Sequence, residues 1–240
     1  MAESHQEWLA QLESESHLKQ EQFMQGIAGR LGRPRLTSAP THPFQGSPGF
    51  WNSFESSLDE RIQHFTENFT AAGGHVQRCI DMEEVRFFIK EKVQQLSARS
   101  IIHQNEVELH NLQLAELANV EVLQWNSSPD EHWISRAAEM DIGIVMADYA
   151  VSHTGSIVVL SSKDKGRSVS LLPTILIALI PIERLKTRLG EVLIHFDDAG
   201  SNHLPAGIHF ISGPSRSADI ENDLTIGVHG PGVVFGLIVG

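Results

Sequence analysis

The sequence is short of several features, and each shortage excludes a class of protein. Its 240 residues contain one cysteine, Cys79, which excludes an internal disulfide. One cysteine also argues against an iron–sulfur cluster held by this chain alone, because such clusters normally take four protein ligands. The sequence has only 18 basic residues against 30 acidic ones, and the net charge of −12 disfavours general binding to nucleic acid or anionic membranes.

Long apolar runs are missing as well. The longest, residues 171–182, contains Pro173 and Pro181 and is too short to span a membrane. The polar, acidic start has neither the basic nor the apolar region of a secretory signal. We therefore expect a cytoplasmic protein without a membrane span. Thirteen histidines are present, but they show no metal-ligand spacing, and we expect no metal site. Phosphate-binding glycine motifs of the Walker type are missing too.

Proline and apolar spacing divide the chain into three parts. Apolar side chains are scattered through residues 3–31, and the later ones recur at helical spacing, which predicts an N-terminal arm, residues 1–31, of one or two helices. Residues 32–50 hold four of the ten prolines and predict an extended linker. Residues 51–240 form the main domain. The arm cannot bury its apolar stripe alone, so we expect it to pack on that domain or on another subunit, which includes a homo-oligomer.

The main domain alternates between strand and helix patterns. This alternation predicts an α/β fold with a mainly parallel sheet, helices on both faces and extra strands late in the chain. We expect a helix start at Ser128–Asp130 and helices near 56–72, 82–97 and 109–117. The expected strands are 75–80, 100–103, 119–124, 142–147, 156–160, 175–180, 192–195, 207–211 and 233–239.

A turn near the C-terminus carries the strongest candidates for ligand binding. An apolar strand ends there in Ser212, Gly213, Pro214, Ser215 and Arg216. The serines can donate hydrogen bonds, and the guanidinium is a planar fork suited to a carboxylate or phosphate. Asp219 would hold the arginine in place. His229 follows between Val228 and Gly230, where we expect partial burial. It could equally be a hydrogen-bonded core histidine or a residue that faces a ligand.

Two further groups follow expected strands. Asp148 ends an apolar strand and could orient Arg167, Arg216 or His153, or it could simply cap a turn. The turn Thr154, Gly155 and Ser156 comes next, and then Gly166 with Arg167. We expect the 212–215 turn and Arg216 to lie within one ligand's reach of residues 148–156. The reason is that both segments follow strands expected to point the same way in a parallel sheet. His153, Asp148 and His229 are the candidates for acid–base chemistry.

The order and spacing of these motifs resemble the lactate utilization protein C family, whose members carry a LUD domain. The resemblance rests on 141–156, on Gly166-Arg167 with 170–173, on 182–184, on the turn after residue 211 and on 227–231. Residues 23–34 look like the family's opening helix. Two positions depart from the family pattern. His153 stands where the family usually has Glu, and Gly232 stands where it often has a basic residue.

The resemblance implies the fold of ribose-5-phosphate isomerase and the CoA transferases. It also implies a component of a cytoplasmic iron–sulfur system that oxidises L-lactate to pyruvate, with the clusters held by cysteine-rich partner proteins. This chain would need no cofactor of its own. It would bind an organic anion, such as lactate, pyruvate or a phosphate-bearing ligand, or organise the complex. Alternatives are a stand-alone phosphosugar or acyl-CoA enzyme of this fold and a pure scaffold. Because an imidazole cannot form an acyl-CoA anhydride, His153 disfavours covalent CoA transfer.

Overall fold

The computed structural model describes residues 2–35, 37–38, 54–128, 132–199, 203–218 and 224–240. The chain divides into two compact units, residues 1–51 and 52–240. Most of the expected linker, from residue 39 onward, lies outside the described residues, and so does Asp219.

One helix, α1 (Ala2–Arg30), makes up most of the first unit and confirms the expected helical N-terminus. Its end follows from Gly32, whose φ of +62° suits glycine. Gly32 N–H donates to Gly29 O and Arg33 N–H donates to Ala28 O, which together form a Schellman cap. Large apolar side chains are exposed along the helix, among them Trp8, Leu12, Leu18, Phe23 and Met24.

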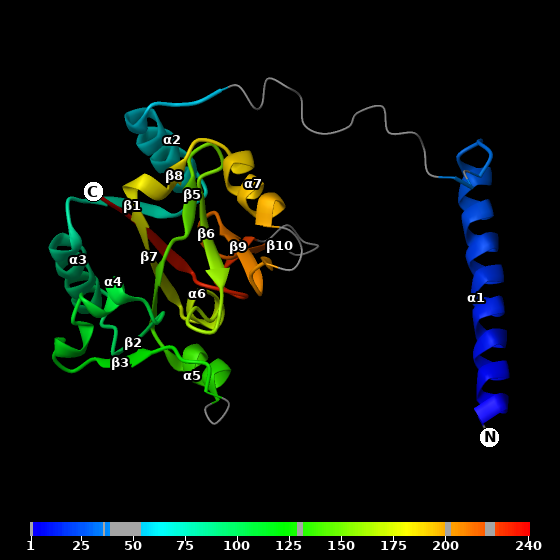
Figure 1. The fold of residues 1–240 in the computed structure, drawn as a ribbon, viewed down its shortest axis with the longest axis horizontal. Helices are drawn as coiled ribbons and strands as arrows, with labels where there is room; N and C mark the ends of the chain where they lie inside the picture. The colour runs from blue at the N-terminus through cyan, green and yellow to red at the C-terminus, as the bar shows by residue number, and fades with distance from the viewer. Residues whose placement is uncertain (1, 36, 39–53, 129–131, 200–202, 219–223) are drawn as a thin grey trace. The chain divides into compact units, whose positions relative to one another are not determined.

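Six strands form an all-parallel central sheet in the second unit (Figure 1). The parallel pairing confirms the expected fold class. In order across the sheet the strands are β1 (His75–Cys79), β12 (Val233–Val239), β7 (Ile175–Pro181), β4 (Ile142–Met146), β2 (Ser100–His103) and β3 (Glu121–Gln124).

Helices cover both faces of this sheet, because alternate residues of the buried strands point to opposite sides. In β7, Ile177 belongs to one core and Ala178 to the other. The Ile177 side packs against α3 (Met82–Gln95), α4 (Val107–His110) and η2 (Leu114–Glu116). The Ala178 side packs against α2 (Leu58–Ala71), α5 (Trp133–Glu139) and α6 (Ser168–Leu171). A capping box, Ser57 with Glu60, starts α2, and Asp81 caps α3.

A second sheet lies on the α2 side of the first. Its strands are β8 (Leu185–Lys186), β5 (Tyr149–Val151), β6 (Ser156–Ser161) and β9 (Gly207–Ile211). In β6, Ile157 faces the central core and Val158 faces α7 (Leu189–Ala199). A short turn, η3 (Ile182–Arg184), leads from β7 to β8. The strands β10 (Arg216–Ala218) and β11 (Leu224–Ile226) form a separate antiparallel pair.

Three expectations about single elements need correction. The strand expected at 192–195 is wrong, because these residues lie in α7, where Val192 and Phe196 recur at helical spacing on one packed face. The helix expected near 109–117 is broken into α4 and η2 by Gln113, which has a φ of +50°. The helix start expected at 128–130 lies partly outside the described residues, and α5 begins at Trp133.

Candidate functional site

The turn after β9 is shaped by close contacts that only glycine permits. Gly213 has a φ of +104°, and a Cβ there would lie 2.7 Å from the carbonyl oxygen of Ala72. Ser215 is tied on both sides, since its N–H donates to Pro231 O and its carbonyl accepts from Gly227 N–H, both at 2.9 Å. The chain from 213 to 216 is therefore held between the end of α2 and the loop before β12. We call residues 212–216 the serine–arginine turn.

The arginine and the second serine of this turn have different neighbours. Ser215 packs against Gly230, where an added Cβ would lie 3.2 Å from Ser215 Cβ. Arg216 is exposed, and its Nη2 atom lies beside Gly73, where a Cβ would come within 2.5 Å of it. Gly73 follows the C-terminal end of α2, where the helix dipole favours a positive charge. The guanidinium is thus placed at a helix end and remains open to solvent.

The hairpin turn between β5 and β6 meets the serine–arginine turn. Ser156 Oγ lies 2.7 Å from Ser212 Oγ, because Ser156 begins β6 and Ser212 directly follows β9, its antiparallel neighbour in the second sheet. Gly155, with a φ of +56°, packs so closely on α2 that a Cβ would lie 2.6 Å from Phe69 N. Asn68 Nδ2 donates to the carbonyls of Ser152 and His153. Thr154 and His153 are exposed, and the His153 ring contacts Phe54 edge-on.

His229 is exposed, which corrects the expected partial burial. It lies in the loop before β12 and lines a groove of 470 Å³ with Thr174, Gly230 and neighbouring residues of α6 and the 227–230 loop. This groove lies at the edge of the central sheet where β7 and β12 begin, since Gly232 N–H donates to Thr174 O. The groove and the serine–arginine turn therefore both lie where the parallel strands of the central sheet begin.

The premise for placing the serine–arginine turn within one ligand's reach of residues 148–156, a shared parallel sheet, is wrong, although Ser212 does lie against Ser156. The strand before the serine–arginine turn, β9, is antiparallel to β6 in the second sheet and does not belong to the parallel sheet. Asp148 lies instead beyond the carboxyl end of β4. Its carboxylate accepts from Leu160 N–H at 2.8 Å and from Lys165 Nζ at 2.8 Å. Among the residues that the structure describes, the basic partner of Asp148 is thus Lys165 rather than Arg167 or Arg216.

Arg167 is separate from this pairing. It is exposed at the start of α6, close enough to His209 that its charge contributes to a lowered His209 pKa, after the larger effect of burial. His209 Nε2 lies 2.8 Å from Ser161 Oγ. The preceding Gly166 has the ring of Trp125 where a Cβ would stand, 2.1 Å from Trp125 Cε2, so this glycine permits a close approach of the loop.

The structure adds three residues at the carboxyl edge that the sequence patterns do not single out. Lys165 Nζ lies 2.6 Å from Glu106 Oε1 as well as 2.8 Å from Asp148 Oδ1, and the three side chains are 13–17% exposed. Burial opposes the lysine's charge, but the two carboxylates outweigh it and raise the pKa of Lys165. Gln104 is fully buried, and its Oε1 accepts from Met146 N–H at 3.2 Å. The polar run Gln104–Glu106 directly after the buried strand β2 is the signal that could have marked this place.

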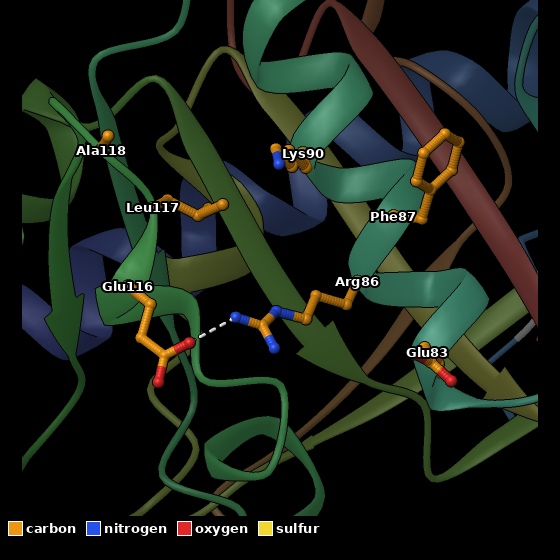
Figure 2. A pocket seen from close by; sticks show the side chains of 7 residues that line it. All are labelled: Glu83, Arg86, Phe87, Lys90, Glu116, Leu117 and Ala118. Carbon is orange, nitrogen blue, oxygen red and sulfur yellow. Dashed lines mark hydrogen bonds and ion pairs between the residues drawn. The ribbon is translucent and has the colours of Figure 1, made fainter.

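A surface groove of 330 Å³ lies on the opposite side of the central sheet, between α3 and residues 116–118 (Figure 2). Arg86 reaches across it to Glu116 and forms an ion pair. The groove contains none of the expected site residues. Its charged side chains are both acidic and basic, so it carries no net preference for an anion. The lining residues are Glu83, Arg86, Phe87, Lys90, Glu116, Leu117 and Ala118.

Cys79 is buried at the end of β1, and the pKa of its thiol is raised to about 11 by burial and by the nearby charges of Glu84 and Asp81. Within the described ranges, no group of three or more His, Cys, Asp or Glu side chains has the arrangement of a metal site. No described helix is long and apolar enough to cross a bilayer.

Comparison with known proteins adds to this geometry. Residues 62–239 match the model of the LUD domain. "Lactate utilization protein C" of Halalkalibacterium halodurans is 36% identical over 217 residues, which cover 89% of this chain and 94% of that protein. The proteins of the same name from Shouchella clausii and Bacillus subtilis are 34% and 30% identical, over 87% and 88% of this chain and 92% of each relative.

A crystal structure of a DUF162 family protein from Deinococcus radiodurans has a similar fold. The TM-score is 0.57 at 17% sequence identity, and the match covers 77% of this chain and 99% of that one. At this identity the likeness concerns the fold alone.

Proposed function

This chain belongs to the LUD-domain family and to its lactate utilization protein C group, and from that premise we propose that it takes part in the use of L-lactate. The observation that carries the proposal is the length of the match. The relatives named for lactate utilization align over nearly their whole length at 30–36% identity, so the likeness is not confined to one shared motif.

The finer part of the proposal concerns the division of labour. We place the chain in the cytoplasm, in a system whose net reaction is the oxidation of lactate to pyruvate. The electron-carrying clusters would be held by cysteine-rich iron–sulfur partner proteins. Two properties of this chain support that division. It has one cysteine, and that thiol is buried with a pKa of about 11, so it offers little of the thiolate that binds iron.

The chain's own contribution would be to bind a small organic anion and to organise the complex. The serine–arginine turn supports an anion role, because Arg216 is exposed beside a tight turn. The contact between Ser156 and Ser212 brings a second hydroxyl-bearing turn to the same place. Thr154 and Gly155 belong to that second turn. Arg167 would act at a separate position, near His209.

A reconstituted system tests the role in lactate use. The purified chain would be combined with its candidate iron–sulfur partners, and the lactate-dependent reduction of an artificial electron acceptor would be followed. We expect activity with all components and its loss when this chain is left out. Full activity without the chain would contradict the proposal. So would growth on L-lactate by a strain that lacks the chain, if that growth equals growth with it.

Titration calorimetry with pyruvate and phosphate tests the anion role of the turn. Arg216→Ala should weaken binding by about 1–3 kcal/mol through the loss of a charge-assisted hydrogen bond. His153→Ala is the matched control and should change affinity much less. Equal losses in the two variants would overturn the binding role of Arg216. A covalent CoA adduct detected by mass spectrometry would overturn the view that acyl transfer is disfavoured.

A further inference from the structure

Four polar side chains, one of them buried and three partly buried, lie where β2 and β4 end. Lys165 makes close ion pairs with Glu106 and Asp148, and Gln104 lies against the last residue of β4. Gln104 is fully buried, yet its Nε2 atom has no hydrogen-bond partner among the described residues. A buried amide N–H group without a partner is costly, and such a group commonly marks a place where another molecule supplies the acceptor. We call this place the Gln104–Lys165 crevice.

The crevice stands where open parallel sheets bind ligands. β2 and β4 are neighbours, but the chain leaves them toward opposite faces of the sheet. After β2 it runs to α4, whose Leu109 packs in the core on the α3 side. After β4 it runs to β5, whose Ala150 packs in the core on the α2 side. Two neighbouring strands whose connections diverge in this way leave a crevice at their carboxyl ends, and ligands of doubly wound sheets bind in that crevice.

A loop that closes over the crevice supplies Lys165. This loop, residues 162–167, follows β6 and is fixed at several points. Asn105 N–H donates to Asp164 O at 3.0 Å, and Asn105 Nδ2 donates to Asp164 Oδ1 at 3.1 Å. Trp125 Nε1 donates to Lys163 O at 3.1 Å. All of these anchors come from the strand-end segments after β2 and β3. The loop is therefore held over the strand ends by polar contacts and not by apolar packing alone.

From this geometry we propose that the Gln104–Lys165 crevice binds a small carboxylic acid that carries a hydroxyl group, and that the 162–167 loop opens to admit it. The donors and acceptors match that chemistry. The ligand's carboxylate accepts from the Lys165 ammonium and from the Gln104 amide, while its hydroxyl donates to Asp148 or Glu106. Arg184, which donates to Ala147 O at 2.8 Å, adds positive charge next to Asp148. The proposal rests on these contacts alone and does not depend on the serine–arginine turn.

Calorimetric titration of the full chain with L-lactate and with propionate tests the proposal, since propionate has the carboxylate and lacks the hydroxyl. We expect L-lactate to bind about tenfold more tightly, from the hydroxyl's hydrogen bond to a carboxylate. Lys165→Met should lower the affinity for L-lactate at least about tenfold. Lys163→Met, an exposed lysine of the same loop, is the matched control and should stay within about twofold. Arg216→Ala should leave the preference for L-lactate over propionate intact.

Three outcomes would overturn the crevice site: equal binding of L-lactate and propionate, equal affinities of the two lysine variants, or loss of the L-lactate preference in Arg216→Ala. If Lys165→Met does not fold, hydrogen exchange of the unmodified chain decides the matter. L-lactate should then slow amide exchange in residues 104–106 and 162–167, and unchanged exchange there would overturn the site. Failure of the reconstituted lactate system without a change in these titrations would reject the proposed function alone.

Discussion

The Gln104–Lys165 crevice and the serine–arginine turn hold their positive charges in opposite ways. In the crevice, Lys165 is mostly buried between two carboxylates. In the turn, Arg216 is exposed at the end of a helix. A buried charge must be matched by partners, so it contributes to the fold as well as to any ligand site. An exposed charge contributes little to the fold. We therefore expect substitutions of Lys165 to change stability as well as binding, and substitutions of Arg216 to change binding alone.

The largest effect on the fold is expected from Lys165→Met. This change leaves Asp148 and Glu106 together with no cation between them, each with a side chain less than one-fifth exposed. Removing one partner of a buried ion pair costs about 3–5 kcal/mol of unfolding free energy, and we expect the lower end because some solvent reaches these groups. Urea unfolding measures the loss, with Lys163→Met as the control. A loss below about 1 kcal/mol would mean that the crevice charges are effectively solvated.

Next to the serine–arginine turn, in the hairpin turn between β5 and β6, the largest loss of unfolding free energy is expected from Gly155→Ala. Gly155 has a φ of +56°, and a Cβ would press on the backbone of Phe69 and Asn68 in α2. Strain of this kind costs about 1–3 kcal/mol. Gly190→Ala is the control, because Gly190 lies in α7 with nothing within 4 Å of an added Cβ, and it should be neutral or slightly stabilising. Thermal unfolding compares the two variants. Equal melting temperatures would show that the turn can shift away from α2.

Low pH should lower the unfolding free energy of the chain through His103, which lies at the end of β2 next to Gln104. Burial, with the nearby charge of His110, lowers the pKa of His103, although its bond to Gln104 O works in the opposite direction. The unfolded chain then binds more protons than the folded chain below about pH 6.5, so stability falls as the pH drops. Urea unfolding between pH 7.5 and 5.5 should show a smaller drop for His103→Gln than for the unmodified chain. Parallel curves would contradict this assignment.

The smallest effect on the fold is expected from Arg216→Ala. Because Arg216 is exposed, its removal should change the unfolding free energy by no more than about 0.5 kcal/mol, even though it weakens anion binding. Urea unfolding of this variant beside Lys165→Met gives the comparison directly. A loss as large as that of Lys165→Met would show that Arg216 has a structural role and would remove the contrast between the two regions.

Sequence patterns predicted the parallel sheet but not the cluster around Lys165, for physical reasons. The strand 142–147 is a continuous apolar run, and such a run reports burial on both faces. Val192–Ile194 is equally apolar but belongs to a helix, because a short apolar run does not distinguish the two periods. The Ser–Gly–Pro–Ser–Arg turn is visible because its residues are consecutive. Lys165 and Glu106 meet only through tertiary contacts, and the sequence does not show which residue the polar run after β2 would contact.

We propose that this member of the lactate utilization protein C group holds a hydroxy acid where the strands of its central sheet end. A crystal structure of the chain grown with L-lactate tests it most directly. We expect the lactate carboxylate within hydrogen-bonding distance of Lys165 Nζ and Gln104 Nε2, with its hydroxyl on Asp148 or Glu106. An unchanged Lys165–Asp148–Glu106 cluster, with lactate at the serine–arginine turn alone or at neither place, would contradict it.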